Sequence, residues 1–569
     1  MSKTRWILLG VLALLALWMF SGGREPTIEP GSALVVEIEG KYVDGVVSPV
    51  LSLFADQEES LLAAVSRLRK AERDDRIETV VLRIRGIQMG WGQAEELRSR
   101  ILALEAAGKR TVALLEFEGY GNASYYLASA AGHVVATPAG HNPFVGIAGE
   151  YLFYGGLLEK VGVQVEYERI GAYKSAVEAY ANSKASDANR EMIQSMIGSV
   201  ETTFVSAIGA SRGMSADEVR AIIDSSPTSP ADMLDAGLID QVAFYDEVMT
   251  SLGDPPVVEA STYDAVSPET VGFRPAATVA MIYGSGPVVT GTGDRSTTGG
   301  RIMASETIAA SIREAVENDD IVAIIFRVNS PGGSPMASDL ILRELQRAQD
   351  EGKPVVVSMS DYAASGGYYV SAGADAIVSH AATLTGSIGV FTIRPSLGGL
   401  YEKLGIGVES VTRGANADLL LVSDVLTPEA RGVLKRDVES IYSLFLDRVA
   451  AGRSMRRKDV DAIAQGRVWT GAQAVELGLV DRIGGFRAAV EEAMDLAGVE
   501  AGADVGIIEY PRPKPIAQQI LELVGARARQ QAPAALALLP RELREMWRTL
   551  AVLPAGQPML LMPGQLTIH

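Results

Sequence analysis

Residues 321-IVAIIFRVNSPGGSPMASDLILRELQRAQDEG-352 hold, in order, an apolar run, a turn rich in Pro and Gly, and a segment with helical periodicity. The first eight residues are β-branched or aromatic for the most part, which is typical of a strand buried on both faces. From Met336 to Gly352 apolar residues recur at i, i+3 and i+4, which predicts an amphipathic helix that stops at the glycine. Two further apolar runs, 354–359 and 376–379, follow. Strands alternating with helices predict parallel pairing through right-handed crossovers, and therefore an α/β fold.

A matching pattern occurs in the first half of the chain. The segment 124-SYYLASAAGHVVA-136 aligns with 367-GYYVSAGADAIVS-379, and 74-DDRIETVVLRI-84 aligns with 318-NDDIVAIIFRV-328. Further pairs of segments match at nearly the same separation along the chain, which indicates an internal repeat. We therefore predict two diverged copies of one domain.

The composition of the chain limits the classes of function. Its 569 residues are 47% hydrophobic and 21% charged, which is typical of a globular protein too long for one ordinary core. The net charge of -19 argues against a nucleic-acid partner, because such binding depends on Lys and Arg that neutralise phosphate. The absence of Cys excludes disulfides, thiolate catalysis and thiolate metal sites.

The N-terminus has the pattern of a segment directed to a membrane. Lys3 and Arg5 precede an uncharged apolar run, 6–20. This run fits either a cleaved signal peptide or a retained anchor, and Trp18 and Phe20 favour the anchor because cleavage prefers small residues. The basic residues would hold the N-terminus inside. We therefore predict a bacterial inner-membrane protein that crosses once, with its domains on the periplasmic side.

These patterns predict five parts of the chain. They are a membrane anchor at 1–25, a first repeat at 30–250, a linker at 251–276, a second repeat at 277–500, and a C-terminal extension at 501–569. The linker is rich in Pro, Ser and Asp, as connecting segments are. The extension matches neither repeat, and the sequence assigns it no function.

The two repeats differ at the turns that follow two of their strands. The second repeat reads 329-NSPGGSP-335 where the first reads 85-RGIQMGW-91, and Ser365 stands where the first repeat has Asn122. Loops at the carboxyl ends of parallel strands converge where α/β folds bind ligands. A nucleophilic serine and its neighbouring glycines are therefore expected at one site, although each turn alone also fits a plain tight turn.

Two backbone amides near Ser365 are candidates for stabilising a negative charge. The N–H of Gly366 follows the serine directly, and Gly333 lies in the turn where glycines allow the backbone N–H to point into a cleft. We predict that Gly333 and Gly366 form an oxyanion hole.

A serine nucleophile needs a base, and the sequence offers two. His380 is the only histidine of the second repeat, and His569 lies in the C-terminal extension, but a solvated loop position is the commoner role of such a histidine. Lys174 lies in 170-IGAYKSAVEAY-180, among small and apolar residues that would lower the lysine pKa. The second repeat has Ala417 there. One composite site would explain why each repeat lacks one partner, whereas alone Lys174 also fits a solvated lysine.

Three segments together resemble the signal peptide peptidase A family, also called protease IV, in its tandem-repeat form. They are 354-PVVVSMSDYAASGGYYVSAGADAIVSHAATLTGSIGV-390, 327-RVNSPGGS-334 and 171-GAYKSAVE-178. The resemblance implies two tandem domains with a crotonase-like fold related to the Clp protease, an N-terminal transmembrane anchor and a homotetramer. It also implies a serine endopeptidase that degrades cleaved signal peptides without a cofactor or metal.

The resemblance assigns roles to individual residues. Ser365 falls on the nucleophile and Lys174 on the general base of a Ser-Lys dyad, while Ser387 falls on a hydroxyl that supports the lysine. Gly333 and Gly366 fall near the oxyanion donors. Three other functions stay open at this point: a crotonase-type enzyme acting on acyl-CoA, a non-catalytic membrane-associated scaffold, and a peptidase that uses His380 as its base.

Overall fold

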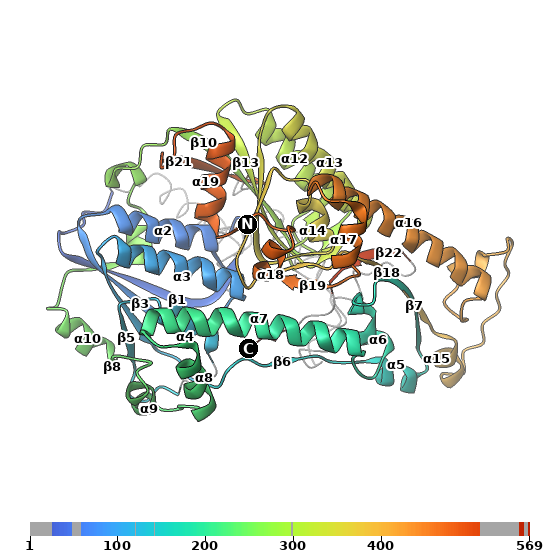
Figure 1. The fold of residues 1–569 in the computed structure, drawn as a ribbon, viewed down its shortest axis with the longest axis horizontal. Helices are drawn as coiled ribbons and strands as arrows, with labels where there is room; N and C mark the ends of the chain where they lie inside the picture. Colours follow the sequence, from blue (N-terminus) through green and yellow to red (C-terminus); the bar gives the residue numbers. More distant parts are fainter. Residues whose placement is uncertain are drawn as a thin grey trace, which may run out of the picture.

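The structure is a computed structural model that describes residues 25–47, 58–119, 121–141, 143–296, 300–512, 557–562 and 567–568. Figure 1 shows two α/β units side by side, with the helix α7 (Asp187–Arg212) running along both. Each unit has its own largely parallel sheet, as predicted. The predicted domain boundaries stay predictions, because nothing here tests their limits.

The first unit is built on a seven-stranded sheet in the order β2-β1-β3-β4-β5-β8, with β9 also paired to β1. The strands are β1 (Ser32–Val43), β2 (Glu58–Ser60), β3 (Ile77–Gln88), β4 (Arg110–Leu115), β5 (His133–Ala136), β8 (Gln241–Val242) and β9 (Val257–Glu259). Its helices, beside α7, are α2 (Leu61–Arg73), α3 (Trp91–Ala106), α4 (Asn122–Ala128), α5 (Gly155–Val161), α6 (Glu178–Ala181), α8 (Ala216–Ser225), α9 (Pro230–Asp235), α10 (Tyr245–Ser251) and α11 (Ala260–Tyr263).

The second unit repeats this plan on an eight-stranded sheet in the order β19-β17-β15-β13-β10-β21, with β16 joining β15 to β20. The strands are β10 (Ala277–Ser285), β13 (Ile321–Ser330), β15 (Val355–Ala364), β16 (Ala376–Ser379), β17 (Leu384–Gly386), β19 (Val468–Thr470), β20 (Arg482–Ile483) and β21 (Val505–Tyr510). Its helices are α12 (Ser305–Val316), α13 (Pro335–Asp350), α14 (Gly366–Ser371), α15 (Gly398–Lys403), α16 (Pro428–Gly452), α17 (Arg457–Ile463), α18 (Gly471–Glu476) and α19 (Phe486–Leu496).

The segment quoted first folds as its pattern predicts. The strand β13 is buried along nearly all its length. Ser334 then caps α13 by accepting a hydrogen bond from the Ala337 amide, and Pro335 occupies the first turn, where a missing N–H costs nothing. The apolar face of α13 covers the sheet and its charged face meets solvent.

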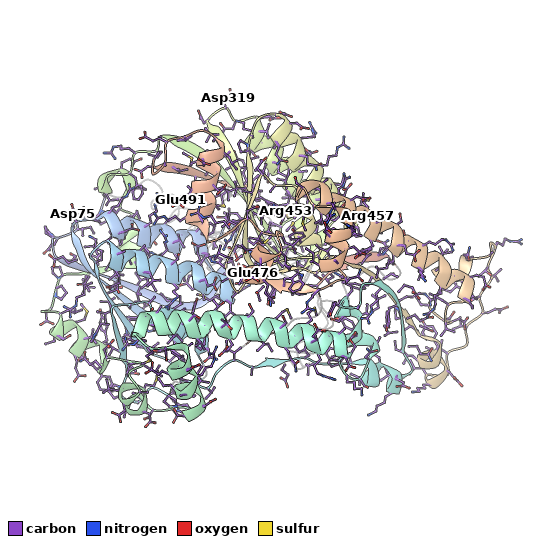
Figure 2. The ribbon with its side chains drawn as sticks, viewed as in Figure 1. Asp75, Asp319, Arg453, Arg457, Glu476 and Glu491 are labelled. Carbon is purple, nitrogen blue, oxygen red and sulfur yellow. The ribbon has the colours of Figure 1, made fainter. Side chains whose placement is uncertain are left out.

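The two units keep the same buried hydrogen bonds at matching positions. Tyr125 donates to the Leu238 carbonyl at 2.7 Å, and Tyr368 donates to the Leu479 carbonyl at 2.9 Å. In a second matching contact, an arginine at the C-terminal end of a long helix donates to an aspartate further along the chain. Arg212, at the end of α7, donates to Asp240, and Arg453 (labelled in Figure 2), at the end of α16, donates to Asp481. Side-chain bonds at equivalent positions in both units mark one ancestral scaffold.

A third sheet of six strands joins the two units in the order β12-β11-β14-β22-β18-β7. It contains β7 (Gln164–Ile170), β11 (Val288–Val289), β12 (Met303–Ala304), β14 (Gly332–Gly333), β18 (Val390–Ser396) and β22 (Pro558–Leu561). The strand β7 belongs to the first repeat by sequence, yet it pairs antiparallel with β18 of the second, with Ile170 opposite Val390. A small sheet pairs β6 (Gly149–Glu150) with β23 (Thr567–Ile568).

The interface between the units contains a buried ion pair. Arg327, on β13, donates to the Asp44 carboxylate at 2.7 Å, and both side chains are inaccessible to solvent. The amide of Gln93, in the first turn of α3, donates to Asp361 at 3.0 Å. Burial, together with the nearby Asp44 carboxylate, raises the pKa of Asp361 to about 6. The N-terminus of α3 therefore rests on the end of β15, a few residues before Ser365.

The predicted localisation needs correction. In the parts of the chain that the structure describes, we find no helix that is both sufficiently long and sufficiently apolar to cross a bilayer. This finding overturns the prediction of a single-pass inner-membrane protein with periplasmic domains. The anchor predicted at 1–25 rests on the apolar run 6–20, which lies outside the described residues.

Candidate active site

Ser365 lies in a sharp turn between β15 and α14. Its φ of 55° and ψ of -110° belong to a conformation that non-glycine residues rarely adopt, and its side chain is fully buried. Its amide donates to the Gly386 carbonyl at 2.8 Å. A Cβ on Gly367 would lie 2.7 Å from the Ser330 carbonyl oxygen, so the helix that follows packs too closely for a side chain there. A strained strand-to-helix turn of this kind presents a nucleophile at the end of a sheet.

Lys174 reaches the second unit because β7 pairs with β18. The chain leaves β7 at Ile170 and turns at Gly171, where a Cβ would meet Gln465 backbone atoms at 2.2 Å. The Lys174 side chain then extends to Ser365, and its Nζ lies 2.7 Å from Oγ. The lysine is fully buried.

Ser387 holds the amine from the other side. Lys174 Nζ donates to the Ser387 backbone carbonyl at 2.8 Å and lies 3.0 Å from its Oγ. Ser387 itself has a φ of 51°, and its amide donates to the Arg467 carbonyl at 2.7 Å. The chain therefore fixes Ser387 by its backbone and presents two oxygen atoms to the amine.

The surroundings of Lys174 favour its neutral form. Burial lowers the pKa of Lys174 well below the usual value for lysine. Among the described residues, the hydrogen-bond partners of Nζ are the neutral oxygen atoms of Ser365 and Ser387. The nearby carboxylate of Glu178 is bound instead by Arg169 at 2.7 Å and by the Ser186 hydroxyl at 2.7 Å. An uncharged amine can accept a proton from the serine hydroxyl.

Gly333 and Gly366 lie beside each other next to the serine. A Cβ on Gly366 would be 2.9 Å from the Gly333 nitrogen, and a Cβ on Gly333 would be 2.1 Å from the Val288 carbonyl oxygen. The two backbone amides are therefore close together in space that admits no side chain. Paired amides of this kind can stabilise an oxyanion.

His380 does not occupy the position that a base would need. It is buried between the units, where Nε2 lies 3.2 Å from a Glu96 carboxylate oxygen and Nδ1 lies 3.5 Å from a Glu95 carboxylate oxygen. Both ring nitrogens thus face carboxylates of α3. The expectation that His380 is a solvated loop residue is wrong, because α3 of the first unit covers it.

Some features of this region were not expected from the sequence. The strand β22, with Leu560 at its centre, lies between β14 and β18 beside the two glycines. The only signal for it is the short apolar run 559-MLLM-562 between two prolines.

Across the described residues, no group of three or more His, Cys, Asp or Glu side chains is arranged to hold a metal ion.

The comparison with protein families identifies the type of chain. The sequence profile described as "Peptidase family S49" matches twice, at residues 103–256 and 347–500. The chain belongs to peptidase family S49. The first match contains Lys174 and the second contains Ser365. Two matches confirm that the chain has two tandem domains of this family and is a serine protease.

Two individual relatives match this chain over most of its length. The chain is 34% identical to "Serine protease SPPA, chloroplastic" of Arabidopsis thaliana, over 88% of this chain and 74% of that protein. It is 31% identical to "Protease 4" of Salmonella typhi, over 94% of this chain and 89% of that protein. These similarities confirm the predicted resemblance to the protease IV family in its tandem form.

The resemblance to solved structures is weaker. A mutant of the 1510-N membrane-bound stomatin-specific protease is 14% identical, matches 42% of this chain and 100% of its own length, and has a TM-score of 0.26. A score this low does not establish a shared fold. The α/β character and the tandem S49 domains are therefore confirmed, whereas the predicted likeness to crotonase and the Clp protease stays a prediction.

Proposed function

We propose that the chain hydrolyses peptide bonds with Ser365 as nucleophile and Lys174 as general base, through an acyl-enzyme on Ser365. The observation that carries this proposal is the 2.7 Å separation of Lys174 Nζ from Ser365 Oγ at a site where the amine is fully buried. A serine hydroxyl is a poor nucleophile until an adjacent base accepts its proton, and a desolvated lysine can do so near neutral pH.

The first half of the reaction forms the ester. Neutral Lys174 accepts the hydroxyl proton while Ser365 Oγ adds to the carbonyl carbon, and the negative charge that develops on the carbonyl oxygen is stabilised by the Gly333 and Gly366 amides. Lys174 then returns the proton to the departing nitrogen. In the second half, water adds to the ester with the same lysine as base, which frees the acid product.

Ser387 acts as a positioning residue in this scheme. Its carbonyl and hydroxyl oxygens lie 2.8 Å and 3.0 Å from Lys174 Nζ, so they orient the lone pair of the amine toward Ser365. Neither oxygen carries a charge that would raise the lysine pKa strongly. This arrangement supports a Ser-Lys dyad over a pairing with His380, whose ring nitrogens face Glu95 and Glu96.

The substrates we propose are cleaved signal peptides, bound as extended chains. The resemblance to the protease IV family suggests them, and the apolar side chains around the site support them. Ala176, Val177, Phe391 and Ile393 form one apolar cluster beside the lysine. Apolar surroundings of this kind suit the hydrophobic core of a signal peptide, because its side chains leave water when they pack there.

We also propose that the chain assembles as a homotetramer. The segment between α15 and α16 projects from the body of the molecule (Figure 1). Large apolar side chains are exposed there, among them Leu404, Val411 and Leu420, with Val411 87% exposed. An exposed apolar patch of this kind indicates an interaction surface, and sedimentation equilibrium tests the assembly.

Variants of the dyad test the proposed reaction. We expect Lys174→Met to lower kcat on an apolar fluorogenic peptide by about 10²- to 10⁴-fold, as loss of a general base does, and Ser365→Ala to lower it further. Lys184→Met, at an exposed lysine of the same repeat, is the matched control and should keep full activity. Full activity in Lys174→Met, with loss in His380→Ala, would overturn the dyad in favour of the histidine.

A further inference from the structure

The three-residue strand β17 positions the oxygen atoms that hold the proposed dyad. The Gly386 carbonyl, at its end, accepts a hydrogen bond from the Ser365 amide at 2.8 Å. Ser387, the next residue, holds the Lys174 amine with two oxygen atoms. The strand pairs parallel with β15, where Ala364 lies opposite Gly386, and antiparallel with β19. A shift of β17 along β15 would therefore displace the contacts of both the serine and the lysine.

The entry loop of β17, residues 380–383, is held by a carboxylate from the first unit. Glu95, in α3, accepts hydrogen bonds from the Ala381 amide at 2.8 Å and from the Ala382 amide at 3.2 Å, one on each carboxylate oxygen. Hydrogen bonds between a carboxylate and backbone amides are among the stronger ones in proteins. One side chain of the first unit thus fixes two consecutive residues, a few positions before Ser387.

His380 and Glu96 extend this contact between the entry loop and α3. The His380 ring lies between two carboxylates, with Nε2 3.2 Å from a Glu96 oxygen and Nδ1 3.5 Å from a Glu95 oxygen. The same Glu96 oxygen accepts a hydrogen bond from the Phe486 amide at 2.7 Å. Burial raises the pKa of Glu95, whereas His380 and the two loop amides act against this rise. Two neighbouring carboxylates of the first unit therefore face the start of the entry loop.

The two repeats differ at the positions that make this contact. The alignment of the repeats places Pro138 where the second repeat has Ala381. Proline has no backbone N–H, so the loop of the first repeat presents no donor there. On the helices, Asp339 of α13 stands where α3 has Glu95, and it is bound by Arg448 of its own unit at 3.0 Å. Of these two helices, α3 alone directs a carboxylate to the other unit at this position.

We propose that Glu95 is a positioning residue for the dyad: by fixing the entry loop, it keeps Ser387 in contact with Lys174. This inference rests on the proposed function, because it takes Lys174 as the base. The first unit then contributes to the site twice, with the lysine itself and with the carboxylate that holds the acceptors of the lysine in place. When the entry loop loosens, Ser387 moves away and water reaches the amine, so the lysine pKa rises toward its ordinary value.

The pH profile of peptide hydrolysis tests the role of Glu95. Glu95→Ala leaves the two loop amides without their carboxylate, and we expect kcat on an apolar fluorogenic peptide to fall by about 10²-fold, as a displacement of about 1 Å in a reacting group does. KM should change little, because the substrate contacts stay. The rise of kcat/KM with pH should move to higher pH, because the Lys174 amine is then protonated over a wider range.

Glu105→Ala is the matched control for the loss of a carboxylate from α3. Glu105, in the last turn of the same helix, accepts hydrogen bonds from the Thr111 amide at 2.9 Å and the Gly132 amide at 3.3 Å, both in the first unit. This variant should lose stability in thermal unfolding but keep the wild-type pH profile. A merely structural role of Glu95 would give the same result in Glu95→Ala, and that result would overturn the inference.

Glu95→Gln keeps the shape of the side chain and one acceptor oxygen, so it carries the test if Glu95→Ala does not fold. We expect its kcat to fall about tenfold and its pH profile to move in the same direction by less. Hydrogen exchange of residues 380–387, followed by mass spectrometry, should be faster than in the wild type, whereas Glu105→Ala should leave it unchanged. Unchanged exchange in Glu95→Gln, or faster exchange with the wild-type pH profile, would overturn the inference.

Failure of this inference is distinguishable from failure of the proposed function. If Lys174→Met is inactive while both Glu95 variants keep the wild-type pH profile, the dyad stands and the positioning role is overturned. If Lys174→Met keeps full activity, the proposed function itself fails, and the positioning role fails with it.

Discussion

The two units of this chain keep one scaffold and differ at the turns that end their central strands. The buried bond of Tyr125 to the Leu238 carbonyl has its equivalent in that of Tyr368 to the Leu479 carbonyl. At the start of the helices that carry these tyrosines, however, the units differ: α4 begins from Gly121 with a φ of -138°, whereas α14 begins from Ser365 with a φ of 55°. Only the second unit stores backbone strain there. The scaffold is retained twice, whereas the features proposed for catalysis are divided between the units.

The division is made possible by one strand. Because β7 pairs with β18 and takes no part in the first sheet, a lysine of the first unit reaches the serine of the second. Neither unit holds both groups. The comparison thus predicts that the site fails when either unit loses its part, and that the scaffold tolerates changes at the equivalent position in the other unit.

The largest expected effect comes from removing the nucleophile. Ser365→Ala should lower kcat by about 10⁶-fold, because no acyl-enzyme can form without the Ser365 hydroxyl. Adding Asn122→Ser, which puts a serine at the equivalent position of the first unit, should restore nothing, since that turn lacks the strained geometry and the glycines. Asn122→Ser alone should keep activity, and peptide hydrolysis by the three variants measures this. Recovery in the double variant would contradict the division.

The next effect concerns the buried ion pair that joins the units. Arg327→Leu leaves Asp44 charged and unpaired in the interior, and we expect a loss of about 3–5 kcal/mol in the free energy of unfolding. Urea denaturation followed by circular dichroism measures it. Arg482→Leu, which removes an exposed pair with Glu491, is the matched control and should cost less than about 1 kcal/mol. Equal losses of unfolding free energy in the two variants would show that the buried pair stabilises the protein no more than an exposed pair does.

A smaller effect is expected at the oxyanion donors. Gly333→Ala adds a Cβ 2.1 Å from the Val288 carbonyl oxygen, so the turn must shift and its amide must move. We expect kcat to fall about 10²- to 10³-fold with KM little changed, as loss of one donor does. Gly198→Ala, in α7 where nothing lies within 4 Å, is the control. A change confined to KM would argue for a binding role instead.

The smallest effect is a pH dependence at the interface. The pKa of Asp361 is raised to about 6 in the folded state by burial and by Asp44, so the folded state retains a proton that the unfolded state has lost between about pH 4 and 6. Stability should therefore fall as pH rises through that window, by up to about 1.4 kcal/mol per pH unit. Asp361→Asn should flatten this slope in thermal unfolding. An identical slope in the variant would exclude Asp361 as its source.

Much of this arrangement could be predicted from the sequence. The apolar run and helical period of 321–352 predict β13 and α13, and the internal repeat predicts two α/β units. The absence of the serine from the first repeat and of the lysine from the second predicts that Lys174 and Ser365 lie together. These inferences depend on local periodicity and on comparison of the copies, which a single sequence contains.

Other features depend on pairing that local pattern does not specify. The residues of β7 predict a strand but not its partner, since pairing with β18 is set by contacts distant in sequence. The carboxylates that cover His380 come from α3 of the other unit. The place of β22 could not be predicted, because four apolar residues alone do not indicate which strands they pair with.

The most direct measurement of the central claim is the rate at which a fluorophosphonate modifies the protein, followed by intact mass and peptide mapping across pH. We predict one adduct, on Ser365, formed at a rate that rises with an apparent pKa well below the usual value for lysine, because burial lowers the pKa of Lys174. The rate should fall as pH drops below that pKa and the amine gains a proton. Lys174→Met should lose this pH dependence and react about 10²- to 10⁴-fold more slowly. Modification of Lys174→Met at the wild-type rate, or an adduct on another residue, would contradict a site shared between the two units.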